Sequence, residues 1–279
     1  MPRASALPQL KLCKHSRGCC GLATSWDGFC VAHAGYRALK SYNARPKPSR
    51  STKNPIGVEL EMFNPISIYH LTPVARFVCS DGSLPANGGE VKLCKPLDKI
   101  ADAAADVAQR ARIAGAKVNK KCGFHVHLSL PGTYSENYEL QANKWQRVAK
   151  FALGIQDMLF DIMPPSRQKN NHFVQKIDDA HDLHNHYSWL SLSSRVPTIE
   201  IRLHGGTVNP WKVKGWIEFC IHFRTVIHNI MNDVQGEKRV VENTLEAIKT
   251  PKDFCPRNSL SYKYIEARES SPSLDKFVF

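Results

Sequence analysis

The sequence predicts a mixed fold in which a β-sheet has one apolar face, covered by helices, and one face lined with charged side chains. Two periodicities lead to this prediction. Four short segments alternate apolar and polar residues, which is the pattern of strands that bury only one face. Three longer stretches repeat apolar residues every three or four positions, as amphipathic helices do. At 279 residues, the chain is long enough to bury a sizeable core.

Residues 56–63 form the first predicted strand and present two acids on one face. Glu59 and Glu61 lie together because side chains two positions apart in a strand point the same way. The opposite face is apolar and consists of Ile56, Val58, Leu60 and Met62. An isolated Glu-x-Glu pair is typical of a solvated strand face, so this strand alone does not indicate a site.

Three later segments repeat the alternation, and their polar positions carry mainly charged or metal-binding side chains. Their polar positions are Glu90, Lys92 and Cys94 in residues 89–96, His125 and His127 in residues 123–130, and Glu200, Arg202 and His204 in residues 198–204. Carboxylate, imidazole and guanidinium groups are the side chains that bind metals and phosphates. If the four strands share one sheet, their polar faces form the floor of a charged cleft.

The remaining elements follow from composition and spacing. Residues 75–79 and 189–192 predict two short strands, and the turn after the first of them brings Asp81 to the rim of the cleft. The polar, histidine-rich residues 166–187 are expected to form a mobile flap over the cleft. Residues 251–279 show little periodicity and are assigned no role. Helical spacing predicts helices over residues 97–114, 138–163 and 211–231, and a shorter helix near residues 240–248.

Residues 1–42 predict a small zinc-binding module. Four cysteines and His33 lie within the 21 residues from Cys13 to His33, and the last two have the spacing Cys-x-x-His. Three thiolates and one imidazole suit tetrahedral zinc, and the metal would supply folding energy that so short a segment lacks. Free thiols unrelated to a metal are the competing interpretation. The predicted ligands are Cys13, Cys19, Cys30 and His33, with Cys20 as the alternative to Cys19.

The positive charge of the chain is concentrated before residue 56. Residues 1–55 contain ten Lys and Arg against one Asp, which leaves only +4 of the total net charge of +13 for the remainder. Such a segment attracts polyanions, so nucleic acid or an acidic protein is an expected partner, with a solubilising basic tail as the alternative. Residues 43–55 carry three prolines and predict a linker to a second domain over residues 56–250.

The sequence also bounds the class of protein. No apolar run approaches the roughly 18 residues that a membrane span needs, and no signal peptide is recognisable. We therefore expect a cytoplasmic protein without a membrane partner, whose nine cysteines are thiols or metal ligands rather than disulfides. The glycine-rich nucleotide-binding loops, the Gly-x-Ser-x-Gly elbow and the His-Glu-x-x-His motif do not occur in the chain.

Four motifs occur in order along the chain: Gly-x-Glu-x-Glu at 57–61, Asp-Gly-Ser at 81–83 followed by Gly-x-Glu at 88–90, Cys-Gly-Phe-His-Val-His at 122–127 and Thr-Ile-Glu-Ile-Arg at 198–202. Together they resemble the amidoligase family, which belongs with the glutamine-synthetase-like carboxylate–amine ligases. The resemblance covers about residues 56–232 and implies an α+β fold, in which a curved, mainly antiparallel sheet forms the cleft and helices pack on its outer face. It also implies a reaction that joins a carboxylate to an amine while ATP is hydrolysed to ADP and phosphate.

The resemblance implies two divalent cations, because the phosphates of ATP repel a carboxylate until they are neutralised. Both ions would be Mg²⁺ or Mn²⁺. Glu59 and Glu61 would hold one ion, and Glu90 and Glu200 would hold its neighbour. The two histidines of the cleft, His127 and His125, would complete a metal shell or contact the phosphate.

The resemblance also implies roles for the cationic and polar residues of the cleft. Arg202 would stabilise charge on the transferred phosphoryl group, as a rigid guanidinium suits. Lys92 and Arg195 are expected to contact phosphate or carboxylate. Asp81 is expected to orient the amine or accept its proton.

Two other classes of protein fit parts of the pattern. The same carboxylates and histidines could activate water in a metal-dependent phosphodiesterase or nuclease. A nucleic-acid-binding protein without catalytic activity would depend mainly on residues 1–55 for its affinity.

Overall fold

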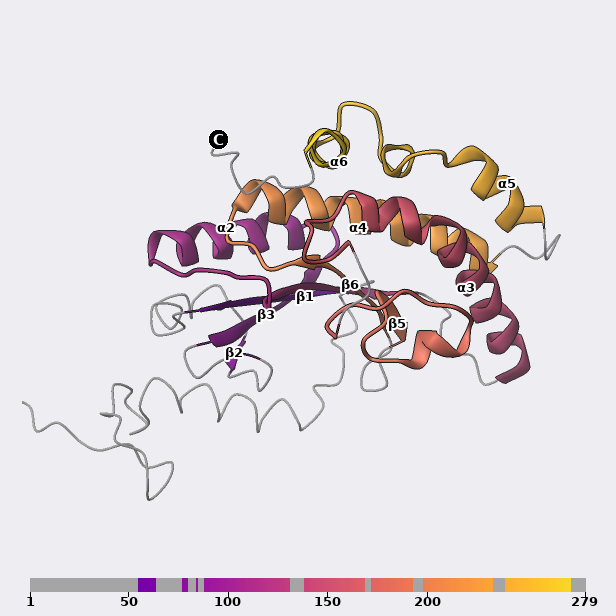
Figure 1. Ribbon diagram of the computed structural model, residues 1–279, viewed down its shortest axis with the longest axis horizontal. Coiled ribbons are helices and arrows are strands. Elements are labelled where there is room, and N and C mark those ends of the chain that lie inside the picture. The colour runs from indigo at the N-terminus through magenta and orange to yellow at the C-terminus, as the bar shows by residue number, and fades with distance from the viewer. Residues whose placement is uncertain are drawn as a thin grey trace, which may run out of the picture.

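A six-stranded antiparallel β-sheet with helices packed on one of its faces forms the centre of the computed structural model (Figure 1). This arrangement confirms the predicted α+β class. The predicted zinc-binding module lies outside the described residues, as do Asp81 and Arg195. The structure describes residues 55–63, 77–79, 84, 88–130, 138–168, 172–192, 198–232 and 239–271.

The strand order places the Glu-x-Glu strand near the middle of the sheet. The order is β2-β3-β1-β4-β6-β5, and each neighbouring pair is antiparallel. All six predicted strands are present, and the two short ones form the edges. Their bounds are β1 Pro55–Phe63, β2 Phe77–Cys79, β3 Gly88–Pro96, β4 Gly123–Ser129, β5 Leu190–Leu192 and β6 Thr198–Gly205.

The helices form a layer on one face of the sheet, with further helices outside it (Figure 1). α2 lies against β1 and β3, and α4 lies against β4, α2 and α3. In the outer layer, α6 packs on α4, and α5 contacts α3. Among the described residues, no helix combines the length and the apolar character needed to cross a membrane. The bounds are α2 Ile100–Ile113, α3 Tyr138–Asp161, α4 Pro210–Asn232, α5 Arg239–Ala247 and α6 Leu260–Ser270, with short 3₁₀ helices at His181–His184 and Pro251–Phe254.

The core lies between the sheet and the helix layer. Val58 of β1 and Val126 of β4 are buried there, as their alternation with polar neighbours predicts. Ala104 and Ala108 of α2 are also fully buried, and their small side chains let the helix approach the sheet closely. Gly115 follows the helix with a φ of 84°, the left-handed conformation in which glycine commonly ends a helix.

A β-bulge in β6 turns His204 away from the charged face, contrary to the sequence prediction. Val126 of β4 pairs with Ile201, whereas Phe124 pairs with His204, so β6 has one extra residue between these two pairs. An extra residue reverses which side chains face which side of a sheet. The imidazole of His204 therefore packs against Trp216 on the helix side.

Helix α6 anchors this buried histidine, although the sequence analysis assigned no role to the C-terminal residues. The hydroxyl of Tyr264 lies 2.6 Å from Nε2 of His204 and accepts a hydrogen bond of 3.0 Å from Nε of Arg268. Ser259 begins the helix and accepts a hydrogen bond from the backbone N–H of Tyr262, as an N-cap residue does. The N-cap serine was the sequence signal for this helix.

Residues 166–187 are packed into the protein where the structure describes them, rather than forming a flap. Val174, Ile177 and Leu183 are buried in the core. Arg167 is 1% exposed and donates a hydrogen bond of 2.7 Å to the carbonyl oxygen of Cys122. The segment is polar in composition, but its few apolar residues are sufficient to attach it to the core.

Replacing Tyr264 by Phe is expected to destabilise the protein. The change removes one hydrogen bond from each of two buried polar groups, His204 and Arg268, which costs about 1–3 kcal/mol in total. Urea denaturation followed by circular dichroism measures the free energy of unfolding. Tyr262→Phe is the matched control, because this half-buried tyrosine on the same helix makes no hydroxyl hydrogen bond among the described residues. An equal loss of stability in the two variants would contradict the assigned role of Tyr264.

Candidate active site

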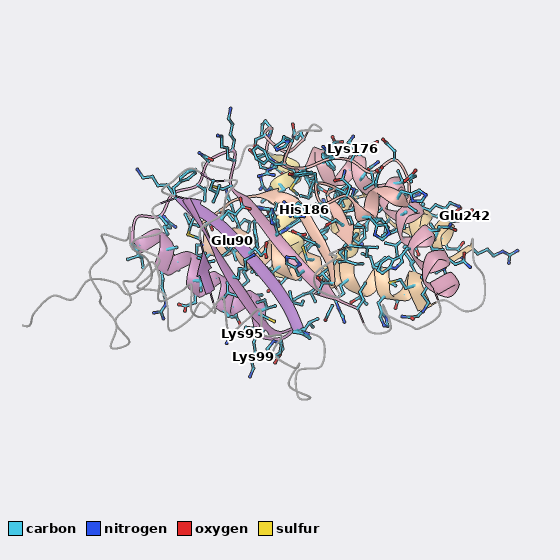
Figure 2. All side chains as sticks on the ribbon, turned by 90° about the horizontal axis from the view of Figure 1, so that it is seen from below. Glu90, Lys95, Lys99, Lys176, His186 and Glu242 are labelled. Atoms are coloured by element: carbon cyan, nitrogen blue, oxygen red, sulfur yellow. The ribbon has the colours of Figure 1, made fainter. Side chains whose placement is uncertain are left out.

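The register of the sheet brings polar side chains of four strands together on the face opposite the helices. Glu59 of β1 pairs with Lys92 of β3 on one side and with His125 of β4 on the other. His127 of β4 pairs in turn with Glu200 of β6. Side chains at paired positions point to the same face and lie close together. Among the described residues, those predicted for the charged face therefore share one surface, with the exception of His204. Figure 2 views the sheet from this side.

Glu59, His127 and Glu200 form a group that could hold a metal ion. One ligand atom from each lies within 4.8 Å of the others. Nε2 of His127 is 3.4 Å from Oε1 of Glu59 and 3.9 Å from Oε1 of Glu200. Nδ1 of the same ring lies 3.3 Å from the hydroxyl of Thr198, which orients Nε2 toward the two carboxylates. A hydrogen bond to the second ring nitrogen is a common feature of metal-binding histidines.

His125 places a second imidazole beside the same carboxylates. The side chain is 5% exposed, and its Nδ1 lies 3.4 Å from Glu200 and 3.5 Å from Glu59. Nδ1 of His125 and Nε2 of His127 are buried, and neither makes a hydrogen bond among the described residues. Two buried nitrogens that face carboxylates without bonding to them fit a site built around a cation.

Two glycines make room for these imidazoles. A Cβ atom at Gly123 would come within 2.3 Å of Nε2 of His125, and one at Gly57 would lie 3.1 Å from Cβ of His127. Gly57 begins one of the sequence motifs and Gly123 is the second residue of another, but the sequence analysis gave them no function. Their contribution is space on the polar face, since any side chain there would displace a histidine.

The structure divides the acids differently from the sequence prediction. We expected Glu59 and Glu61 to share one ion and Glu90 and Glu200 to share another. Instead, Glu59 of β1 groups with Glu200 of β6, and β4 lies between these two strands. Oε2 of Glu61 accepts a hydrogen bond of 2.6 Å from the backbone N–H of Gly123, so this acid helps to join β1 to the start of β4.

Two cationic side chains flank the acids. On the β3 side, Nζ of Lys92 lies 2.7 Å from Glu59 and 2.9 Å from Glu90. On the β6 side, the guanidinium of Arg202 donates a hydrogen bond of 2.5 Å to Oε1 of Glu200. Arg202 is 8% exposed, so its charge acts in a largely dehydrated setting where electrostatic interactions are strong.

The crowded charges shift the pKa values of the group. Burial and the adjacent Glu59 carboxylate raise the pKa of Glu90 to about 8. Burial also disfavours the charged form of Glu59, but the imidazoles of His125 and His127 outweigh it and hold the pKa of Glu59 well below its usual value. Burial lowers the pKa of His127, but the negative charges of Glu59 and Glu200 outweigh burial and raise this pKa above its usual value. Glu59 is thus the charged member of its pair with Glu90 at neutral pH.

His186 lies at the edge of this site and was not predicted to belong to it. Partial burial lowers the pKa of His186, and the positive charge of Arg202 lowers it further. The labelled side chains of Glu90 and His186 both lie on the side of the sheet seen in Figure 2. Residues 166–187 therefore contribute one imidazole near the cleft, although their other three histidines were equally prominent in the sequence.

The affinity of the site for Mn²⁺ is expected to increase with pH. Protonated His127 cannot offer Nε2 to a metal, and its raised pKa makes protons compete at neutral pH. As the pH rises toward this pKa, the dissociation constant for Mn²⁺ should fall by up to about tenfold per pH unit, as measured by calorimetry. His127→Gln should weaken binding and flatten this dependence, whereas His228→Gln on α4 should change neither. A steep dependence retained by His127→Gln would exclude this histidine as the titrating ligand.

Comparison with known protein families matches residues 96–182 to a family described as "Putative amidoligase enzyme". The matched residues include α2, β4 with both site histidines, and α3, but not β1 or β6. No curated protein sequence matches the chain. The part of the chain that contributes His125 and His127 is therefore similar to amidoligases, which supports the family resemblance and an amide-forming ligase activity.

Proposed function

We propose that this protein is an ATP-dependent ligase that joins a carboxylate to an amine through an acyl-phosphate intermediate. The observation that carries the proposal is the convergence of Glu59, His127 and Glu200 beside Arg202 on one face of the sheet. Acidic and imidazole ligands for a divalent cation, next to a fixed guanidinium, are suited to binding and transferring a phosphoryl group. The match to amidoligases supports the same reaction class.

The reaction requires activation because a carboxylate has no leaving group. In the first step, an oxygen of the substrate carboxylate attacks the γ-phosphorus of ATP, the bond to the β–γ bridging oxygen breaks, and ADP leaves. The amine nitrogen then attacks the acyl carbon, the carbon–oxygen bond to phosphate breaks, and inorganic phosphate leaves. The amine loses one proton, for which we propose Asp81 as the acceptor.

Glu59, His127 and Glu200 would hold the divalent cation, Mg²⁺ or Mn²⁺. When bound there, the ion supplies positive charge that neutralises the phosphates of ATP. The donor set fits this task, because two carboxylates and an imidazole are already gathered and two buried ring nitrogens lack hydrogen-bond partners. His125 faces the same carboxylates and is proposed to contact the ion or the phosphate.

Arg202 is proposed to stabilise the phosphoryl group during transfer. Its contact with Glu200 fixes the guanidinium on the β6 side of the acids. Nε of Arg202 is buried and makes no hydrogen bond among the described residues, so the protein leaves this donor unsatisfied. Arg195 and Lys92 are proposed as further contacts to the anionic substrates.

The N-terminal residues are proposed to act separately from this site. Cys13, Cys19 or Cys20, Cys30 and His33 would bind a structural zinc ion. The basic charge of residues 1–55 would bring the ligase to a large anionic partner, either a nucleic acid or an acidic protein.

Hydroxylamine offers a test that does not require the natural amine. It attacks acyl phosphates to form hydroxamates, which give a coloured ferric complex, so only the carboxylate has to be varied. With ATP and Mg²⁺, we expect hydroxamate from at least one member of a panel of amino acids, small carboxylic acids and peptides. Glu59→Gln should abolish this product, and Arg202→Ala should lower its rate by at least about 100-fold, the effect of losing a transition-state donor.

Glu242→Gln is the matched control for Glu59→Gln. Glu242 is exposed on α5 and projects from the end of the molecule distant from Glu90 (Figure 2), so its replacement should leave hydroxamate formation unchanged. Cleavage of nucleic acid with Mn²⁺ and without ATP, lost in Glu59→Gln, would instead indicate a phosphodiesterase. Neither activity, together with salt-sensitive nucleic-acid binding that requires residues 1–55, would indicate a binding protein.

A further inference from the structure

We propose that the cleft holds one divalent cation rather than two, because the ammonium group of Lys92 occupies the position of a second ion between Glu59 and Glu90. The inference rests on the proposed function only in assuming that Glu59, His127 and Glu200 bind a divalent cation. It replaces the two-ion arrangement expected from the sequence. It also gives Lys92 a role distinct from that of a simple substrate contact.

The contacts of Lys92 are those of a bridging cation. Its Nζ lies 2.7 Å from Oε1 of Glu59 and 2.9 Å from Oε2 of Glu90, so it joins acids from two strands. A divalent ion would have to draw the same oxygens to about 2.0–2.2 Å. The ammonium and a second ion therefore compete for one position.

The fold fixes Lys92 at this position. Lys92 pairs directly with Glu59 across β3 and β1, and Glu90 lies two residues earlier on the same face of β3. The lysine side chain therefore rises between the two acids by virtue of the strand register. Its side chain is 36% exposed, which leaves it accessible to a bound anion, and the two carboxylate contacts use two of its three N–H donors.

The atoms without hydrogen-bond partners identify the other position as the metal site. Nδ1 of His125 and Nε2 of His127 are buried without hydrogen bonds, and both lie next to Glu59 and Glu200. No atom of Lys92 or Glu90 is among the buried polar atoms that lack a partner in the described residues. The polar groups on the β3 side are thus already satisfied, whereas those between β1 and β6 are not.

The stoichiometry of Mn²⁺ binding tests this inference without an activity measurement. Equilibrium dialysis of the full chain with metal analysis should give one Mn²⁺ per wild-type chain. Lys92→Met keeps the length of the side chain but removes the charge, and should raise the ratio to two because Glu59 and Glu90 become available. Lys95→Met should leave the ratio at one, since Lys95 is an exposed lysine on the same strand (Figure 2) without contact to the acids.

The remaining outcomes of the dialysis experiment separate an error about Lys92 from an error about the metal site. Two Mn²⁺ ions per wild-type chain, or one in a folded Lys92→Met variant, would overturn the assignment of Lys92 while leaving the proposed ligase intact. No Mn²⁺ in any variant would overturn the metal site and, with it, the proposed function. If Lys92→Met does not fold, Glu90→Gln decides the matter: a ratio of one, unchanged from wild type, supports a single-ion cleft, and a fall from two to one contradicts it.

Discussion

The antiparallel register on both sides of β1 is the constraint on which the site depends. It places Glu59 opposite Lys92 on one side and opposite His125 on the other. Because side chains alternate along a strand, a slip of one residue in either pairing would turn the acids toward the helices and the apolar residues toward solvent. Burial of Val58 and Val126 under the helix layer therefore secures the geometry of the charged face. The apolar packing against the helices thus determines which side chains lie on the opposite, charged face of the sheet.

Assembling several acids on a largely buried surface is unfavourable unless positive charge balances them. The protein meets this requirement in three ways. Lys92 and Arg202 bond directly to carboxylates, the two imidazoles approach Glu59, and Glu90 retains a proton near neutral pH. The balance is still incomplete between β1 and β6, where ring nitrogens have no hydrogen-bond partner. The divalent cation proposed for this position would supply the missing positive charge.

Much of the fold could be predicted from the sequence, because strand and helix periodicities reflect burial directly. The six strands, the main helices and the shared face of Glu59, His127 and Glu200 follow from those patterns. The wrong prediction for His204 shows the limit of such patterns. A bulge changes which side chains face each side of the sheet without changing the composition of the strand. Helix α6 was missed because Tyr264 and Arg268 are buried polar residues that obscure its apolar stripe. The grouping of the acids depends on pairing between distant strands, which no local pattern specifies.

The bulge in β6 connects the charged face of the sheet to helix α6. Arg202 and His204 stand two residues apart on opposite faces of the same irregular strand, and His204 is tied to α6 through Tyr264. A chain shortened after α5 would leave this imidazole without its partner, immediately beside the guanidinium proposed to meet phosphate. Helix α6 therefore stabilises β6 from the helix side of the sheet, and a fragment that keeps His204 paired has to include this helix.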